Sequence, residues 1–154
     1  MQSPFFLKSI RLSEDMDLDI HTASAAALTN NVRRIFAMRS FLASLEARGI
    51  RIERNTEAKQ TSTTQRWKIG LRIIATGAEV PTKLEFSRRE SSGQVIIEPA
   101  DPELCASLDL LPVLAPHYSK AAALNQKIDA LIHRTQTQAR DVFDLIHLKK
   151  SGVR

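Results

Sequence analysis

The stretch Arg11-Leu12-Ser13-Glu14-Asp15-Met16-Asp17-Leu18-Asp19-Ile20 alternates acidic and apolar side chains from Asp15 onward. Successive side chains of a β-strand point to opposite faces of a sheet, so this alternation predicts a strand with one apolar and one acidic face. Carboxylates that share a sheet face repel one another, and aspartate is uncommon in strands. A bound cation can offset that repulsion, and Mg²⁺ is held in proteins by carboxylates together with substrate phosphates. The pattern is also typical of an exposed strand near a sheet edge, kept soluble by its charge.

The composition is that of a globular domain. The chain has 154 residues, of which 43% are hydrophobic, so it can bury one core. It contains no apolar run near the roughly 20 residues of a membrane-spanning helix, and no signal-peptide pattern. A single cysteine, Cys105, excludes an internal disulfide and is expected in the core. We therefore expect a cytoplasmic protein without a membrane partner. Its net charge of +5 suits RNA or an acidic protein as partner.

The periodicity of apolar residues predicts an α+β fold. Apolar side chains recur at three- and four-residue intervals over 29–48, which is typical of an amphipathic helix. Helices are also predicted at 119–134, capped by Ser119, and at 138–149. We expect a sheet core at 1–100 and a helical part at 101–154, packed as one compact unit. The remaining strands are predicted as an antiparallel meander, and they cover 50–53, 66–74, 82–88 and 94–98. The polar segment at 55–64 is predicted as a loop or hairpin end.

Glu85 is the predicted partner of the acidic strand. On its own strand it lies on the face opposite to Leu84 and Phe86. If the two strands are neighbours, Asp15, Asp17 and Glu85 share one face of the sheet. Phosphoryl-transfer enzymes hold two metal ions on such a cluster of carboxylates. The alternative is that Glu85 pairs with a lysine or arginine across the sheet.

A second group of charged residues lies near the end of the chain. Lys127 and Arg134 are seven residues apart on a predicted helix and therefore share a face, while Asp141 and Asp144 share a face of the next helix. A lysine at this kind of site supplies a point charge for a triphosphate. The alternative is an ordinary salt-bridged helix hairpin, in which Arg134 or Arg140 pairs with Asp141.

Taken together, these motifs resemble the AbiEii nucleotidyltransferases, the toxin components of abortive-infection, type IV toxin–antitoxin systems. The resemblance covers about residues 10–148 and rests on these segments: Arg11-x-Ser13-x-Asp15-x-Asp17, Lys127-Ile128-x-Ala130-Leu131-x-x-Arg134 and Arg140-Asp141-x-x-Asp144-Leu145. It implies a nucleotidyltransferase-like mixed β-sheet flanked by helices, with a helical C-terminal part.

The resemblance also implies roles for individual residues. It assigns Asp15, Asp17 and Glu85 as ligands of Mg²⁺ or Mn²⁺. It assigns Ser13, Lys127 and Arg134 as nucleotide-binding residues. It assigns Asp141 as a catalytic residue, either a base or a positioning group. The reaction implied is transfer of a nucleotide from a nucleoside triphosphate to an RNA or protein acceptor, with tRNA-type acceptors among relatives, and an antitoxin protein as partner.

The start of the chain departs from the family pattern. Family members carry a Gly-Gly or Gly-Ser turn and a helix ahead of the acidic strand, which lets the backbone approach the phosphates. Ten residues precede Arg11, and none is glycine. We therefore expect either a piece of a longer parent or an N-terminally shortened relative, with weaker triphosphate binding and a tendency to form homo-oligomers.

Two alternatives follow from this departure and from the charge pattern. In one, the chain is a catalytically inactive nucleotidyltransferase fold that binds RNA or an antitoxin. In the other, both charged groups are only ion-pair networks that stabilise the structure.

Overall fold

The computed structural model describes residues 15–20, 23–88, 93–136 and 139–150. The chain divides into two compact units: the first is Glu14–Glu90, and the second includes Ser91–Arg154. No helix among the described residues is both long and apolar enough to cross a membrane.

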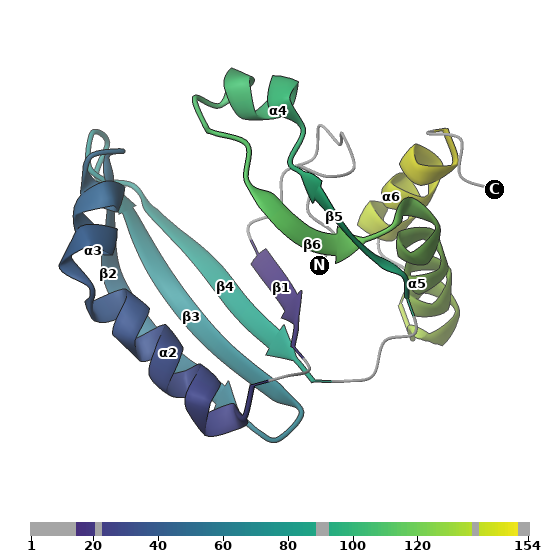
Figure 1. Ribbon diagram of the computed structural model, residues 1–154, viewed down its shortest axis with the longest axis horizontal. Helices are drawn as coiled ribbons and strands as arrows, with labels where there is room; N and C mark the ends of the chain where they lie inside the picture. Colours follow the sequence, from purple (N-terminus) through teal and green to yellow (C-terminus); the bar gives the residue numbers. More distant parts are fainter. Residues whose placement is uncertain (1–14, 21–22, 89–92, 137–138, 151–154) are drawn as a thin grey trace. The chain divides into compact units, whose positions relative to one another are not determined.

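The first unit is a mixed four-stranded sheet with the strand order β1-β4-β3-β2. The first strand runs parallel to its neighbour β4, and the other pairs are antiparallel. Two helices lie along one face of this sheet (Figure 1). The predicted α+β class, a mixed sheet flanked by helices, is therefore confirmed. The elements are β1 (Asp15–Asp19), α2 (Ala25–Ala37), α3 (Arg39–Glu46), β2 (Ile50–Gln60), β3 (Thr64–Ile73) and β4 (Glu79–Ser87).

The core of this unit lies between α2 and the sheet. Leu28 and Val32 of α2 pack against Trp67 and Ile69 of β3, and all four are buried. The Trp67 ring also makes an edge-to-face contact with Phe86 of β4, with the ring centroids 5.8 Å apart. Burying these apolar groups is the main favourable term that holds helix and sheet together. The opposite face of the sheet is left to polar side chains.

A buried glutamine fixes the start of α2 on the sheet. The Gln65 side chain is buried, and its Nε2 donates to the carbonyl of Ala25 at 2.8 Å and to the Thr29 hydroxyl at 2.6 Å. Its Oε1 accepts a hydrogen bond from Arg88 Nη2 at 3.0 Å. Because a buried amide is costly unless its donors and acceptor are satisfied, these bonds specify one placement of the helix.

The predicted helix at 29–48 is two helices. Met38 has an extended backbone, with φ −73° and ψ 121°, and it ends α2 and begins α3. The rings of Phe36 and Phe41 pack against each other across this break, with their centroids 6.2 Å apart. The apolar periodicity continues through the break, and neither glycine nor proline marks it, so the sequence pattern did not indicate the interruption.

Two predictions about the strands need correction. The segment 55–64, predicted as a loop or hairpin end, does contain the turn of the β2–β3 hairpin, but only at 61–63. Before that turn β2 continues to Gln60 as a polar edge strand, with irregular register near Ile52/Arg54 and Glu57/Lys59. With little apolar surface to bury, such a strand carries no clear alternation. The predicted strand at 94–98 exists but does not extend the meander, because it pairs with a different strand in the second unit.

The second unit combines a two-stranded antiparallel sheet with helices. The strand β6 was not predicted, because it contains Pro116 and shows no clear alternation. Proline is tolerated there because both strands of a two-stranded sheet are edge strands. The predicted cap of the first long helix is confirmed, with the Ser119 hydroxyl accepting from the amide of Ala122 at 3.3 Å. Cys105 is buried, as expected. The elements are β5 (Val95–Pro99), α4 (Pro102–Ser107), β6 (Leu114–Tyr118), α5 (Lys120–His133) and α6 (Ala139–Lys150).

The contact between α2 and the sheet predicts a large effect of Leu28→Ala. Leu28 is 6% exposed, so truncation should lower the free energy of unfolding of the first unit by about 2–5 kcal/mol. Trp67, the single tryptophan, lies in the same core, and its fluorescence during urea titration reports this unit. Leu111→Ala, at a residue 84% exposed, is the control and should change the value by less than about 0.5 kcal/mol. Equal effects of the two substitutions would contradict this placement of the core.

Candidate functional site

The acidic strand and the strand of Glu85 are neighbours, as predicted. In the register of β1 with β4, Asp15 lies beside Lys83 and Asp17 beside Glu85. Leu84 and Phe86, which alternate with these β4 residues, pack against the core. The charged residues therefore lie on the face of the sheet that points away from α2. The side chains of Asp15, Asp17 and Glu85 share this face.

These three carboxylates converge on the ammonium group of Lys83. Its Nζ lies 3.3 Å from Asp15 Oδ2, 3.3 Å from Asp17 Oδ1 and 3.7 Å from Glu85 Oε2. The alternation along β4 puts Lys83 on this face as well, but the sequence analysis assigned it no role. The available signal was its position two residues before Glu85, which brings a cation between the two acidic strands.

Glu85 has a second cationic partner, which was one of the two alternatives considered for it. Arg66 lies directly across from Glu85 in the β3–β4 pairing, and its Nε donates to Glu85 Oε2 at 2.6 Å. The Glu85 side chain is 20% exposed, so this ion pair is partly shielded from water. Glu85 is thus both a cross-strand partner of an arginine and a member of the acidic cluster.

The charges in this cluster shift the pKa values of its members. Burial raises the pKa of Glu85, but the hydrogen bond from Arg66 and the charges of Arg66 and Lys83 outweigh it, so the pKa lies below its ordinary value. Burial likewise lowers the pKa of Lys83, but the charges and hydrogen bonds of Asp17 and Asp15 outweigh it and raise that pKa. Glu85 is ionised and Lys83 is charged at neutral pH.

The chemistry of the cluster fits a hard divalent cation. Asp15, Asp17 and Glu85 offer carboxylate oxygens, the ligands that Mg²⁺ and Mn²⁺ prefer, around a point that already attracts a positive charge. Within the described parts of the chain, however, no three histidine, cysteine, aspartate or glutamate side chains are arranged as a ready metal site. In this arrangement the Lys83 ammonium group occupies the point between the three carboxylates.

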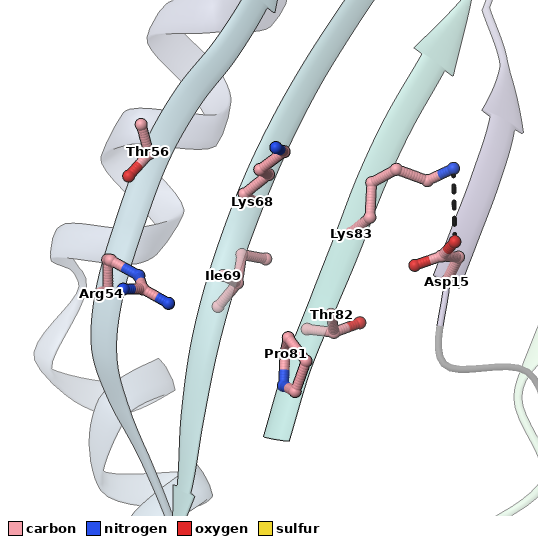
Figure 2. A pocket seen from close by; sticks show the side chains of 8 residues that line it. All are labelled: Asp15, Arg54, Thr56, Lys68, Ile69, Pro81, Thr82 and Lys83. Atoms are coloured by element: carbon pink, nitrogen blue, oxygen red, sulfur yellow. Dashed lines mark ion pairs between the residues drawn. The ribbon is translucent and has the colours of Figure 1, made fainter. Parts of the chain in front are cut away.

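A hollow of about 550 Å³ lies beside the cluster, on the same sheet face (Figure 2). Arg54 and Lys68 give it a positive rim on β2 and β3. Gly70 leaves room for the Arg54 side chain: a Cβ atom added at residue 70 would lie 3.4 Å from the Cβ of Arg54. Strand β1 and strand β4 close the other side of the hollow, which is lined by Asp15, Arg54, Thr56, Lys68, Ile69, Pro81, Thr82 and Lys83.

The second predicted group forms one ion-pair network between α5 and α6. Lys127 Nζ lies 2.8 Å from Asp144 Oδ2 and 3.7 Å from Asp141 Oδ1. Arg134 also pairs with Asp141. Asp141 is buried and lies in the first turn of α6, where the helix dipole favours a negative charge. Asp141 and Asp144 both contact Lys127, so their predicted shared face is confirmed. Arg134 lies just past the end of α5 at His133, with an extended backbone, so it reaches Asp141 from beyond the helix and not from a helix face shared with Lys127. The contacts are those of the salt-bridged helix hairpin.

Two of the predicted positions lie outside this description. Ser13, assigned to the nucleotide, and Arg11 of the same motif precede the described residues. The side chain of Arg140 is also outside them. The acidic cluster belongs to the first unit and the α5–α6 network to the second.

Comparison with protein families identifies the chain. The model of the AbiEii nucleotidyltransferase toxin of type IV toxin–antitoxin systems matches residues 5–154. The chain belongs to the AbiEii family. A comparison with curated proteins finds no significant match.

Solved structures support the same fold for this AbiEii chain. JHP933 from Helicobacter pylori superposes with a TM-score of 0.59 at 23% identity, over 92% of this chain and 51% of that one. A candidate nucleotidyltransferase from H. pylori gives a TM-score of 0.58 at 25% identity, over 92% of this chain and 53% of that one. The AbiEii chain therefore spans about half the length of the structures that it matches.

The shifted pKa of Glu85 predicts a pH-dependent effect of Glu85→Gln in metal-free protein. The folded state lowers this pKa below its ordinary 4.5, so the ionised group stabilises the fold above that pH and stops doing so as the pH falls through the lower value. At pH 7 the substitution should cost about 1–2 kcal/mol, because Arg66 loses a charged acceptor. Urea titrations at pH 7 and pH 3, followed by Trp67 fluorescence, should show this loss shrinking with acid.

The matched control for this prediction is Glu79→Gln. Glu79 lies on the same strand and pairs with Arg72 at 3.0 Å, but its side chain is 64% exposed. Its substitution should cost less than about 0.5 kcal/mol at either pH. A cost of Glu85→Gln that stays constant between pH 7 and pH 3 would contradict the ionised, Arg66-bonded state of Glu85.

Proposed function

We propose that this chain is a metal-dependent nucleotidyltransferase of AbiEii toxin type, which transfers a nucleotide from a nucleoside triphosphate to an RNA acceptor. The observation that carries the proposal is the meeting of Asp15, Asp17 and Glu85 around one cationic point, in a chain of this family. A bound Mg²⁺ or Mn²⁺ would lower the pKa of the attacking hydroxyl and neutralise charge on the transferred phosphate.

The residues of the first unit would hold and orient the reacting groups. Asp15, Asp17 and Glu85 would bind the cation. Arg66 would keep Glu85 oriented, because its hydrogen bond at 2.6 Å fixes one carboxylate oxygen on the sheet face. The pairing of β1 with β4 supports this role, since a site on strands holds its geometry more closely than one on loops.

Within the second unit, Lys127 and Arg134 would bind nucleotide phosphates. Each already lies against a carboxylate, but a lysine ammonium and a guanidinium carry several donors and can serve a phosphate as well. Asp141 would position these two cations, or act as a base, as the family resemblance implies. Ser13 is proposed for the nucleotide on the resemblance alone.

The positive hollow supports RNA rather than protein as acceptor. Arg54 and Lys68 extend from the acidic cluster across β3 and β2, so a phosphate backbone could be held beside the proposed metal site. The net charge of +5 favours the same polyanionic partner.

A second candidate function is binding without catalysis. It is favoured by one observation: Lys83 already neutralises part of the acidic cluster without a metal ion. In that case the chain would act by contacting RNA or the antitoxin that its family implies, alone or as a homo-oligomer. The chain would then bind RNA equally well with and without metal and would transfer no nucleotide.

The proposed metal site predicts the effect of replacing Asp15 and Asp17 together by alanine. Isothermal titration with Mn²⁺, in the presence of a nonhydrolysable nucleoside triphosphate, should lose at least about tenfold in affinity, and transfer of labelled nucleotide to RNA should disappear. Glu79→Gln removes a carboxylate six residues from Glu85 on β4, roughly 20 Å away, and should change neither measurement. Unchanged Mn²⁺ affinity in the double variant would contradict the site.

The positive hollow predicts a loss of RNA affinity when Arg54 and Lys68 are both replaced by glutamine. Removing two cations that bind phosphates should weaken a tRNA-sized ligand about 5- to 20-fold at moderate salt. The fall of log affinity with log salt should also become shallower, with the magnitude of its slope smaller by about 1–2. Fluorescence anisotropy at several salt concentrations measures both, with Arg51→Gln, an arginine paired to Glu46, as the control. An unchanged slope would place RNA elsewhere.

A further inference from the structure

We propose that Lys83 is a built-in counter-cation of the acidic cluster, which occupies the place of the divalent ion and has to leave when that ion binds. This inference rests on the proposed metal site of Asp15, Asp17 and Glu85. It assigns to Lys83 the role of tuning metal affinity, so that the site is stable without metal and is filled only by an ion that can displace an ammonium group.

The geometry of Lys83 supports this exchange. One ammonium nitrogen lies within 3.3–3.7 Å of oxygens from three separate carboxylates on two strands. A conventional cross-strand ion pair on this sheet looks different: Arg72 bridges Glu53 at 2.7 Å and Glu79 at 3.0 Å with separate nitrogens of its guanidinium. Lys83 therefore lies at the one point that all three acidic groups share.

The charges favour the replacement. Three carboxylates carry three negative charges, of which Lys83 and Arg66 neutralise two. A divalent ion in place of the ammonium group would neutralise the remaining one. The three carboxylates would also repel one another if the cation left without replacement, which explains why a lysine at this position is useful in the metal-free protein.

The hollow beside the cluster gives Lys83 somewhere to go. Lys83 itself lines this hollow, and its ammonium reaches from β4 toward Asp15 on β1 (Figure 2). Its flexible four-carbon stem can turn into that space without moving the strand. There the displaced charge would join Arg54 and Lys68, so metal binding would make the hollow more positive.

The exchange predicts that Lys83→Met binds Mn²⁺ more tightly than the wild-type chain. Isothermal titration without nucleotide should give an affinity at least about fivefold higher, because the ion no longer competes with the ammonium group. The metal-free variant should have a lower Tm than wild type, and saturating Mn²⁺ should raise its Tm by more than it raises that of wild type.

Two further variants keep the test specific. Arg72→Met removes the same charge from the same sheet face and should leave Mn²⁺ affinity within about twofold of wild type. Lys83→Arg keeps a cation and should bind Mn²⁺ no more tightly than wild type. It also assigns the NMR signal of Lys83, which is the lysine side-chain signal that is present in wild type and missing in this variant. If Lys83→Met does not fold, the wild-type Lys83 signal should still shift on Mg²⁺ addition and saturate with the bound fraction.

The outcomes separate this inference from the proposed function. If Mn²⁺ binds wild type and Lys83→Met equally, or binds the variant more weakly, Lys83 is not a competitor and the inference is overturned while the metal site stands. A wild-type Lys83 signal that does not respond to bound Mg²⁺ overturns it in the same way. If neither protein binds Mn²⁺, both the metal site and the inference are overturned.

Discussion

The repulsion among carboxylates on one face of the β1–β4 pair is the constraint on which the candidate site depends. Asp15, Asp17 and Glu85 lie within reach of one another because parallel strands in register place them on the same face. Like charges at that spacing destabilise a sheet unless cations offset them. Here Lys83 and Arg66 provide that offset, and the proposed divalent ion would bind at the point that Lys83 now occupies.

The core of the first unit holds this arrangement in register. Leu84 and Phe86 pack beneath the strands with Trp67, so a shift of β4 by one residue would turn its apolar residues to water and its charged ones into the core. Gln65 fixes α2 on the same sheet through hydrogen bonds to Ala25 and Thr29. The polar face can therefore carry unfavourable charge because the opposite face supplies the stability.

The acidic cluster could be predicted from the sequence because side-chain alternation alone decides which face of a strand a residue occupies. Glu85 was grouped with Asp15 and Asp17 on that basis, and the shared face of Asp141 and Asp144 was predicted from helical spacing. The same alternation puts Lys83 on this face, but it does not show where the end of a long, flexible side chain lies. The meeting of its ammonium group with all three carboxylates was therefore not predicted. The polar second half of β2, beyond the predicted 50–53, and the proline-containing strand β6 were missed, since neither carries the alternation that identifies a strand. The assignment of Ser13 to the nucleotide stays a prediction.

The most direct test of the central claim is paramagnetic broadening of backbone amide NMR signals by substoichiometric Mn²⁺. If the ion binds where the two acidic strands meet, the amides of Asp15, Asp17, Lys83 and Glu85 should broaden first, and the far end of β4 at Glu79 should remain sharp. Broadening that begins at Glu79, or spreads evenly over the acidic residues of the chain, would contradict a single cation site on the β1–β4 face.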